Sequence, residues 1–222
     1  MTSAEKSGYA VLRQVSRQPP PLIEPPLNFY QLHWRIAAGT ALAFLIFTGL
    51  DHLFFHTFEH VRGIDWVYLP AGIRLLCTLL FGFTGSVGLF LGSCLAAFLY
   101  YFPDEPTRAL VGSAISAFAP YLAYVLAQTT MRLRPTLSNL TARKLLACAL
   151  LYAGCNTLLH LLWFITTGDP GPHPWHSSAI MLMGDLSGSL IVVYLFKHIL
   201  SATRRYRRLR RRVYRHQPPP LG

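Results

Sequence analysis

The most informative feature of this sequence is how little charge it carries. Charged residues make up 13% of the 222 residues, against roughly 25% in an ordinary soluble domain, whereas hydrophobic residues make up 52%. Acidic residues are especially scarce, with 9 Asp and Glu against 20 Lys and Arg. Several apolar runs also approach the length of about 20 residues that a transmembrane helix needs. These observations exclude an ordinary soluble domain and predict an all-α, polytopic membrane bundle.

Three other absences narrow the function. No C-x-x-C pair is present, and the four cysteines lie inside apolar runs, which argues against a disulfide framework or a zinc site. No intramembrane nucleophile–base pair or pair of carboxylates stands out, so we expect neither an enzyme nor a cofactor. Residues 1–26 contain no apolar stretch of the kind found in signal peptides, so we expect the first transmembrane helix to direct insertion.

Apolar runs and turn residues predict six transmembrane helices. The expected spans are residues 31–50, 66–81, 86–102, 109–128, 145–165 and 179–196. The run at residues 66–102 is too long for one crossing of about 20 residues, and Gly82-Phe83-Thr84-Gly85 is a natural turn within it. The membrane domain thus covers residues 31–200, between a proline-rich tail at residues 1–30 and an arginine-rich tail at residues 201–222.

The basic residues indicate how these spans are oriented. Most of the 20 Lys and Arg lie in the two tails and in the loop at residues 132–144, which alternating spans place on one side. The loops on the other side are richer in acidic residues, including Asp104, Glu105 and Asp169. The positive-inside rule then predicts that both termini are cytoplasmic.

Apart from Arg35, which anchors the first span at the membrane interface, two charged residues lie inside the predicted spans. At 1.5 Å per helical residue, Arg74 lies about 12 Å and Asp185 about 9 Å below the outer ends of their spans. A guanidinium in hydrocarbon costs roughly 3 kcal/mol, so it needs a partner or a wet cavity, and Asp185 is the best partner for an ion pair. His160 lies about 8 Å from the outer end of its span, and Asn156 shares its helix face one turn deeper. These four residues predict a polar cavity that opens to the outside.

The sequence leaves the role of this polar group open. The four side chains can recognise a ligand, or they can fix helix packing through an internal ion pair and an Asn–His pair. Passage of protons or ions is a third interpretation. Glycines such as Gly184 and Gly188, spaced as G-x-x-x-G, predict close helix approach and describe architecture more than chemistry.

Two further groups could bind ions or lipids. His52, His56 and His60 recur every four residues, so on one continuous helix they would share a face that could bind metal, respond to pH or simply be polar. The C-terminal tail is expected to contact anionic lipid headgroups, and nothing in it reads nucleic-acid bases. Its lipid-contacting residues would be Arg204, Arg205, Arg207, Arg208, Arg210, Arg211 and Arg212.

One pattern along the chain resembles a known family. The residues Trp66…Leu69-Pro70-Ala71-Gly72-Ile73, then Gly88…Phe90-Leu91-Gly92 and Gly184-Asp185…Gly188, resemble the membrane-associated sensor domains that precede bacterial diguanylate cyclases and histidine kinases. The resemblance implies a sensory or interaction module of the bacterial inner membrane. The sequence departs from it by ending without an output domain and by placing Arg74 where an aliphatic residue is expected.

The residues and the resemblance together predict a non-enzymatic, sensor-like membrane module. It would recognise a small ligand or a protein partner through the outer cavity and signal through a partner protein. The alternative is a small transporter component, such as the substrate-binding membrane subunit of a vitamin importer. A neighbouring gene for a cyclase or kinase would favour the sensor, and one for an energy-coupling ATPase would favour the importer.

Overall fold

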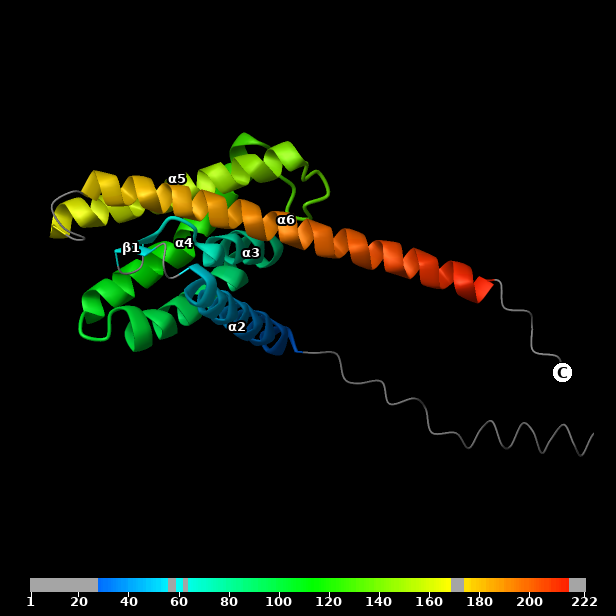
Figure 1. The fold of residues 1–222 in the computed structure, drawn as a ribbon, viewed down its shortest axis with the longest axis horizontal. Coiled ribbons are helices and arrows are strands. Elements are labelled where there is room, and N and C mark those ends of the chain that lie inside the picture. The colour runs from blue at the N-terminus through cyan, green and yellow to red at the C-terminus, as the bar shows by residue number, and fades with distance from the viewer. Residues whose placement is uncertain (1–27, 56–58, 62–63, 169–173, 216–222) are drawn as a thin grey trace, which may run out of the picture. The chain divides into compact units, whose positions relative to one another are not determined.

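The described chain is almost wholly helical (Figure 1). The computed structural model describes residues 28–55, 59–61, 64–168 and 174–215. Side chains are described for residues 28–54, 64–168 and 174–199. The elements in chain order are helix α2 (Phe29–Phe55), strands β1 (Glu59–Val61) and β2 (Ile64–Asp65), and helices α3 (Leu69–Ala96), η2 (Ala97–Tyr101), α4 (Pro106–Thr130), α5 (Ala142–Thr167) and α6 (Pro174–Arg215). Two compact units contain them: Met1–Leu32, described only where α2 begins, and His33–Gly222.

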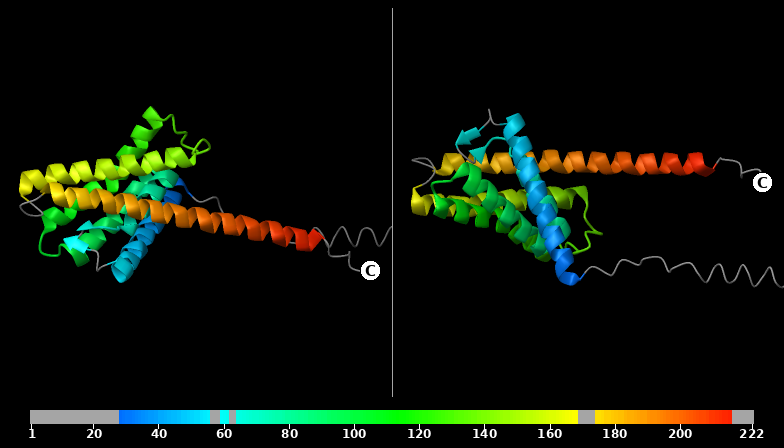
Figure 2. Two further views of the ribbon diagram at one scale, coloured as in Figure 1. Left: turned by 45° about the horizontal axis from the view of Figure 1, so that its top comes forward. Right: turned by 90° about the horizontal axis from the view of Figure 1, so that it is seen from below.

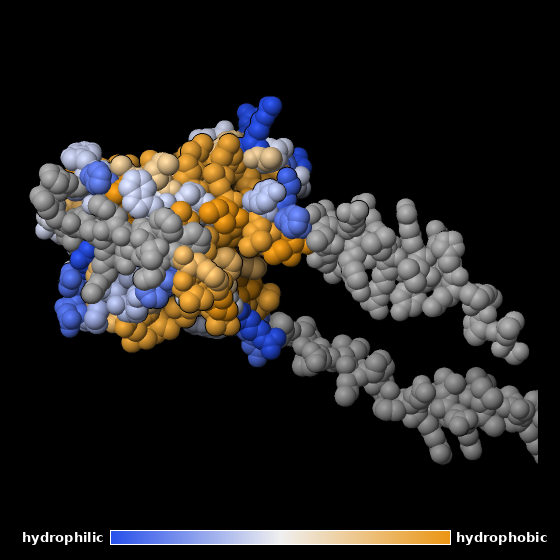
Figure 3. All heavy atoms as spheres, viewed as in Figure 1, coloured by the Kyte–Doolittle hydropathy of each residue, from blue (hydrophilic) through white to orange (hydrophobic). Residues whose placement is uncertain are grey.

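The helices have the lengths and surfaces of a membrane bundle. Five described stretches are long and apolar enough to cross a bilayer: Phe29–Phe54, Leu69–Tyr101, Pro106–Thr130, Ala142–Thr167 and Pro174–Ile199. On the face drawn in Figure 3, apolar residues cover much of the described surface, and strongly hydrophilic residues gather near its two ends. The expectation of an all-helical, multi-pass membrane bundle is therefore confirmed.

Helix α3 contains the break that the sequence predicted. Gly82 has φ 56° and ψ −133°, a conformation that glycine adopts without the steric cost of a side chain. A Cβ on Gly85 would press against the carbonyl of Cys77, and Cys77 also packs in one buried cluster with Leu89. Eight residues span about 12 Å on a straight helix, so such contacts require a reversal. The two halves of α3 therefore fold back on each other at Gly82.

Small residues allow the helices to approach closely. α3 packs against α4 and α6, and α5 packs against the same two helices. The views in Figures 1 and 2 both show α5 and α6 side by side. α2 meets the second half of α3 where a Cβ on Gly88 would collide with the main chain of Ala37 and a Cβ on Gly92 would lie tightly against that of Ala41. Close approach through small residues is the usual way in which membrane helices gain packing energy.

The stretch before α3 crosses the glycine face of α6. The N–H of Tyr68 donates to the carbonyl of Gly184 at 3.1 Å, and the hydroxyl of Ser187 donates to the carbonyl of Trp66 at 3.1 Å. A Cβ on Gly184 or Gly188 would collide with main-chain atoms of this stretch. The G-x-x-x-G pair therefore admits an extended backbone segment.

The end of α2 differs from the prediction. α2 ends at Phe55, and His60 lies in β1, which pairs antiparallel with β2. The expectation that one helix carries His52, His56 and His60 on a single face is therefore wrong, although His56 itself lies outside the described residues. Each short strand contains one β-branched residue, Val61 in β1 and Ile64 in β2, and β-branched residues favour extended backbone over helix.

Replacing Gly188 with alanine should destabilise the bundle, because the new Cβ meets backbone that cannot rotate away. Overpacking of this kind costs about 1–3 kcal/mol, so the detergent-extracted variant should melt at a lower temperature than the wild type. Gly154→Ala in α5 is the matched control, since a Cβ there has nothing within 4 Å. Equal melting temperatures for the two variants would contradict the backbone contact.

Candidate functional site

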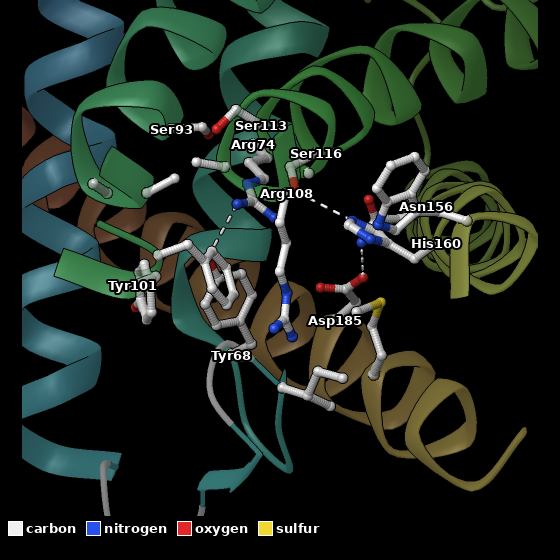
Figure 4. A pocket seen from close by; sticks show the side chains of 18 of the residues that line it. Tyr68, Arg74, Ser93, Tyr101, Arg108, Ser113, Ser116, Asn156, His160 and Asp185 are labelled. Atoms are coloured by element: carbon white, nitrogen blue, oxygen red, sulfur yellow. Dashed lines mark hydrogen bonds between the residues drawn. The ribbon is translucent and has the colours of Figure 1, made fainter. Parts of the chain in front are cut away.

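A partly enclosed cavity of about 100 Å³ lies where β2 and the helices α3 to α6 converge (Figure 4). The four residues predicted as a site, Arg74, Asn156, His160 and Asp185, all line this cavity. They come from α3, α5 and α6, which are far apart in the sequence. The further polar residues of its wall are Asp65, Tyr68, Ser93, Tyr101, Arg108, Ser113 and Ser116.

Arg74 is buried among aromatic rings. Its side chain begins about one turn into α3, and the residue is only 5% exposed. Its guanidinium carbon lies 4.9 Å from the ring centroid of Phe44 and 5.0 Å from that of Tyr68, and Nη2 donates to the Tyr68 hydroxyl at 3.0 Å. Ring faces and a hydroxyl thus stabilise the cation.

Asp185 is held by an amide. Nδ2 of Asn156 donates to Oδ2 of Asp185 at 2.6 Å, and both residues are 2% exposed. The bond joins α5 to α6 at the cavity wall. A short, charge-assisted bond of this type is among the stronger hydrogen bonds in proteins, so it fixes the orientation of the carboxylate.

His160 lies one turn from Asn156 on α5, as the spacing predicted. Its Nε2 is 3.4 Å from the hydroxyl of Ser116 on α4, and its ring centroid is 5.7 Å from that of Phe164. His160 and Asn156 therefore share a helix face but reach different partners. The expected internal Asn–His pair is replaced by one contact to α4 and one to α6.

The expected ion pair between Arg74 and Asp185 is not formed by these two described side chains. Arg74 contacts Tyr68, Phe44 and Tyr152, whereas Asp185 accepts from Asn156. Residue counting placed the two charges at similar depth, but depth does not decide the direction in which each side chain points. The described ion pair near the cavity joins Arg108 to Glu105, at 3.3 Å.

Sequence reasoning missed the contribution of α4. Arg108 falls just outside the predicted span at residues 109–128, yet it lies in the first turn of α4 and its guanidinium reaches into the cavity in Figure 4. It also lies 4.2 Å above the ring of Phe102. Arg108, Gly112 and Ser116 recur every four residues, so one helix face carries them all to the cavity. This four-residue spacing is visible in the sequence and could have indicated that α4 contributes to the cavity wall.

Several polar atoms of the cavity wall lack a partner among the residues that the structure describes. They are Oγ of Ser93, Oγ of Ser113 and Oδ1 of Asn156, all buried. Buried polar atoms are nearly always hydrogen-bonded, because leaving one unpaired costs about 1–3 kcal/mol. The wall of this cavity is therefore equipped to bind a polar molecule.

The histidine row and the arginine tail fall largely outside the described side chains. His52 lies against Tyr100, with ring centroids 5.1 Å apart, but the side chains of His56 and His60 are not described. Among the described residues, no group of three or more His, Cys, Asp or Glu is placed to hold a metal ion. The backbone of α6 continues as helix to Arg215, so the tail arginines extend the same helix that carries Asp185.

Comparison with known proteins decides the family. The family model of MASE1 matches residues 34–220, which is most of the chain. The chain belongs to the MASE1 family. MASE1 is a membrane-associated sensor domain found in bacterial diguanylate cyclases and histidine kinases, so the resemblance read from the sequence is confirmed. No curated protein and no solved structure matches the chain.

Membership of MASE1 supports a multi-pass membrane protein with a sensor role in signal transduction. It favours the sensor interpretation over the importer subunit. The family is not catalytic, which agrees with the expectation of a non-enzyme. Membership of MASE1 assigns no role to individual cavity residues, so their role has to be inferred from their geometry.

Replacing Asn156 with leucine should leave the Asp185 carboxylate without its donor. Hydrogen bonds to charged groups contribute about 1.5–3 kcal/mol, so the variant should melt well below the wild type. Thr157→Val on the same helix is the control, because the Thr157 hydroxyl is buried without a partner and its loss should be neutral or stabilising. If Asn156→Leu proved as mild as Thr157→Val, the Asn156–Asp185 bond would have no structural role.

Proposed function

We propose that this protein is a sensor module of the bacterial inner membrane that binds a ligand in the cavity and passes its state to a partner protein. The observation that carries the proposal is the cavity itself. It gathers buried polar side chains from α3, α4, α5 and α6, and several of their atoms have no partner in the described part of the chain. Intramembrane ionisable residues that face a cavity are characteristic of functional sites.

The distribution of basic residues supports an outward-facing cavity. Its wall is built from the start of α3, the start of α4 and the end of α5. The opposite ends of these helices adjoin Gly82 and the loop between α4 and α5, which holds Arg132 and Arg134. By the positive-inside rule this basic side is cytoplasmic, so six spans with both termini in the cytoplasm remain our proposal.

In this arrangement the first half of α3 begins below the outer surface. Residues 69–81 reach about 20 Å as a helix, which is less than the hydrocarbon thickness of about 30 Å. The stretch before it would complete the crossing, and hydrogen bonds to α6 hold its backbone: the N–H of Tyr68 donates to the carbonyl of Gly184, and the carbonyl of Trp66 accepts from the hydroxyl of Ser187. Irregular backbone is tolerated at membrane depth when it is buried in protein in this way.

α6 is the element suited to carry the signal. It presents Asp185 to the cavity and continues as one helix to Arg215. A ligand that moves Asp185 would bias the position of the whole helix. The arginine-rich end would lie at anionic headgroups, where each charge contributes about 1 kcal/mol, and close to a cytoplasmic signalling partner.

The topology can be tested with single cysteines in a variant whose four native cysteines are replaced. A cysteine at Asp104 should react with an impermeant maleimide added to intact cells, because the loop before α4 is expected outside. A cysteine at Ser138 should react only after permeabilisation. Labelling of the Ser138 position in intact cells would overturn the proposed orientation.

Ligand binding can be tested by filling the cavity without removing any polar group. A Cβ on Gly112 would lie 4.0 Å from Cε1 of His160, so leucine there would project into the cavity. The small-molecule fraction of a bacterial cell extract should raise the melting temperature of the wild type but not of Gly112→Leu, since only a folded, open site gains from mass action. Gly154→Leu, at a position with nothing within 4 Å, should respond like the wild type. An extract that stabilises none of them, or all three equally, would refute the binding role.

A further inference from the structure

We infer that the cavity takes a small zwitterion, a molecule with a carboxylate at one end and a protonated amine at the other, as in a free amino acid. This inference rests on the proposed function and names the chemistry of its ligand. The cavity of about 100 Å³ is far smaller than the roughly 300–1,000 Å³ of sites for drug-sized molecules. Its ligand must therefore be small.

One end of the cavity is rich in hydrogen-bond donors. Arg74 lies together with Ser93 and Ser113 in Figure 4, and the hydroxyls of the two serines are buried without partners among the described residues. The residues are 5%, 5% and 3% exposed, respectively. Two hydroxyls beside a guanidinium form a donor set that matches the oxygens of a carboxylate.

The other end offers acceptors. Asp185 brings a carboxylate, and Oδ1 of Asn156 is buried without a partner beside it. Both side chains lie on the opposite side of the cavity from Ser93 and Ser113 in Figure 4. A carboxylate and a bare amide oxygen can accept the hydrogens of an ammonium group, which has three donors and no acceptor.

The two ends together discriminate between ligand classes. A simple anion would satisfy Arg74 but would bring its charge towards Asp185. A simple cation would satisfy Asp185 but would approach Arg74. The charged residues of the wall are two arginines, Arg74 and Arg108, and two aspartates, Asp65 and Asp185, so the wall as a whole does not favour a net charge. A ligand with separated and balanced charges fits both ends, because like charges brought together are strongly disfavoured.

The test uses the full-length protein in lipid nanodiscs and measures the melting temperature and the affinity by calorimetry. The probes are the twenty standard amino acids. Each amino acid that binds is compared with the acid that lacks its amino group and the amine that lacks its carboxylate, for example alanine with propionate and ethylamine. We expect at least one amino acid to bind and both of its analogues to bind about 30-fold more weakly or worse, the loss for removing one partner of a buried charge contact.

Variants report which end holds which charge. Asp185→Asn should weaken binding of the amino acid. It should also reduce the difference in affinity between the amino acid and the deaminated acid, because the carboxylate that repels the deaminated acid is gone. Ser93→Ala and Ser113→Ala are mild changes that should lower the affinity for the amino acid and for the deaminated acid by similar factors. Ser189→Ala is the control, because its hydroxyl is also buried without a partner but does not line the cavity. This pattern of relative affinities does not arise from a general loss of stability.

The outcomes separate this inference from the proposed function. If no amino acid binds, or if a simple carboxylate or a neutral sugar binds as tightly as any amino acid, the zwitterion inference is wrong. The proposed function survives that result if the cell extract still stabilises the wild type and fails to stabilise Gly112→Leu. If the extract also has no effect, both fail.

Discussion

The structure depends on how a permanently charged guanidinium is accommodated inside an apolar bundle. Insertion of an arginine near the bilayer centre costs roughly 3 kcal/mol, and no carboxylate contacts Arg74 directly among the described side chains. Two aromatic faces and one phenolic oxygen take that role. Cation–π contacts contribute about 2 kcal/mol when desolvated, so Phe44 and Tyr68 together offset much of the insertion cost.

Because aromatic rings stabilise the Arg74 cation, its positive charge stays separated from the negative charge of Asp185 across the cavity. Arg74 is fixed on α3 and Asp185 on α6, and the two helices are packed against each other through glycine. In a medium of low dielectric constant such separated charges create a stronger field than they would in water. The bundle thus maintains a polarised cavity, where a neutralising salt bridge would have produced a closed packing contact.

Some of this arrangement could be predicted from the sequence, and the reason is geometric. Helical rise is constant, so counting residues placed Arg74, Asn156 and Asp185 in the outer half of the bilayer, and a span limit of about 20 residues required the break found at Gly82. Rotation about each helix axis is set by packing, which counting does not reveal. Asp185 therefore met Asn156 instead of Arg74. Arg108 was missed because a residue near a helix end can point to solvent or inward, and only the fold decides.

The turn at Gly82 also bears on how the chain enters the membrane. The first half of α3 is short and carries Arg74, so as a separate segment it would be a poor candidate for stable insertion. Residues 83–101 contain no charged side chain and follow immediately after the turn. Closing so short a loop adds little entropic penalty. The two halves are therefore best inserted together as a helical hairpin, in which the apolar second half compensates for the charge on the first.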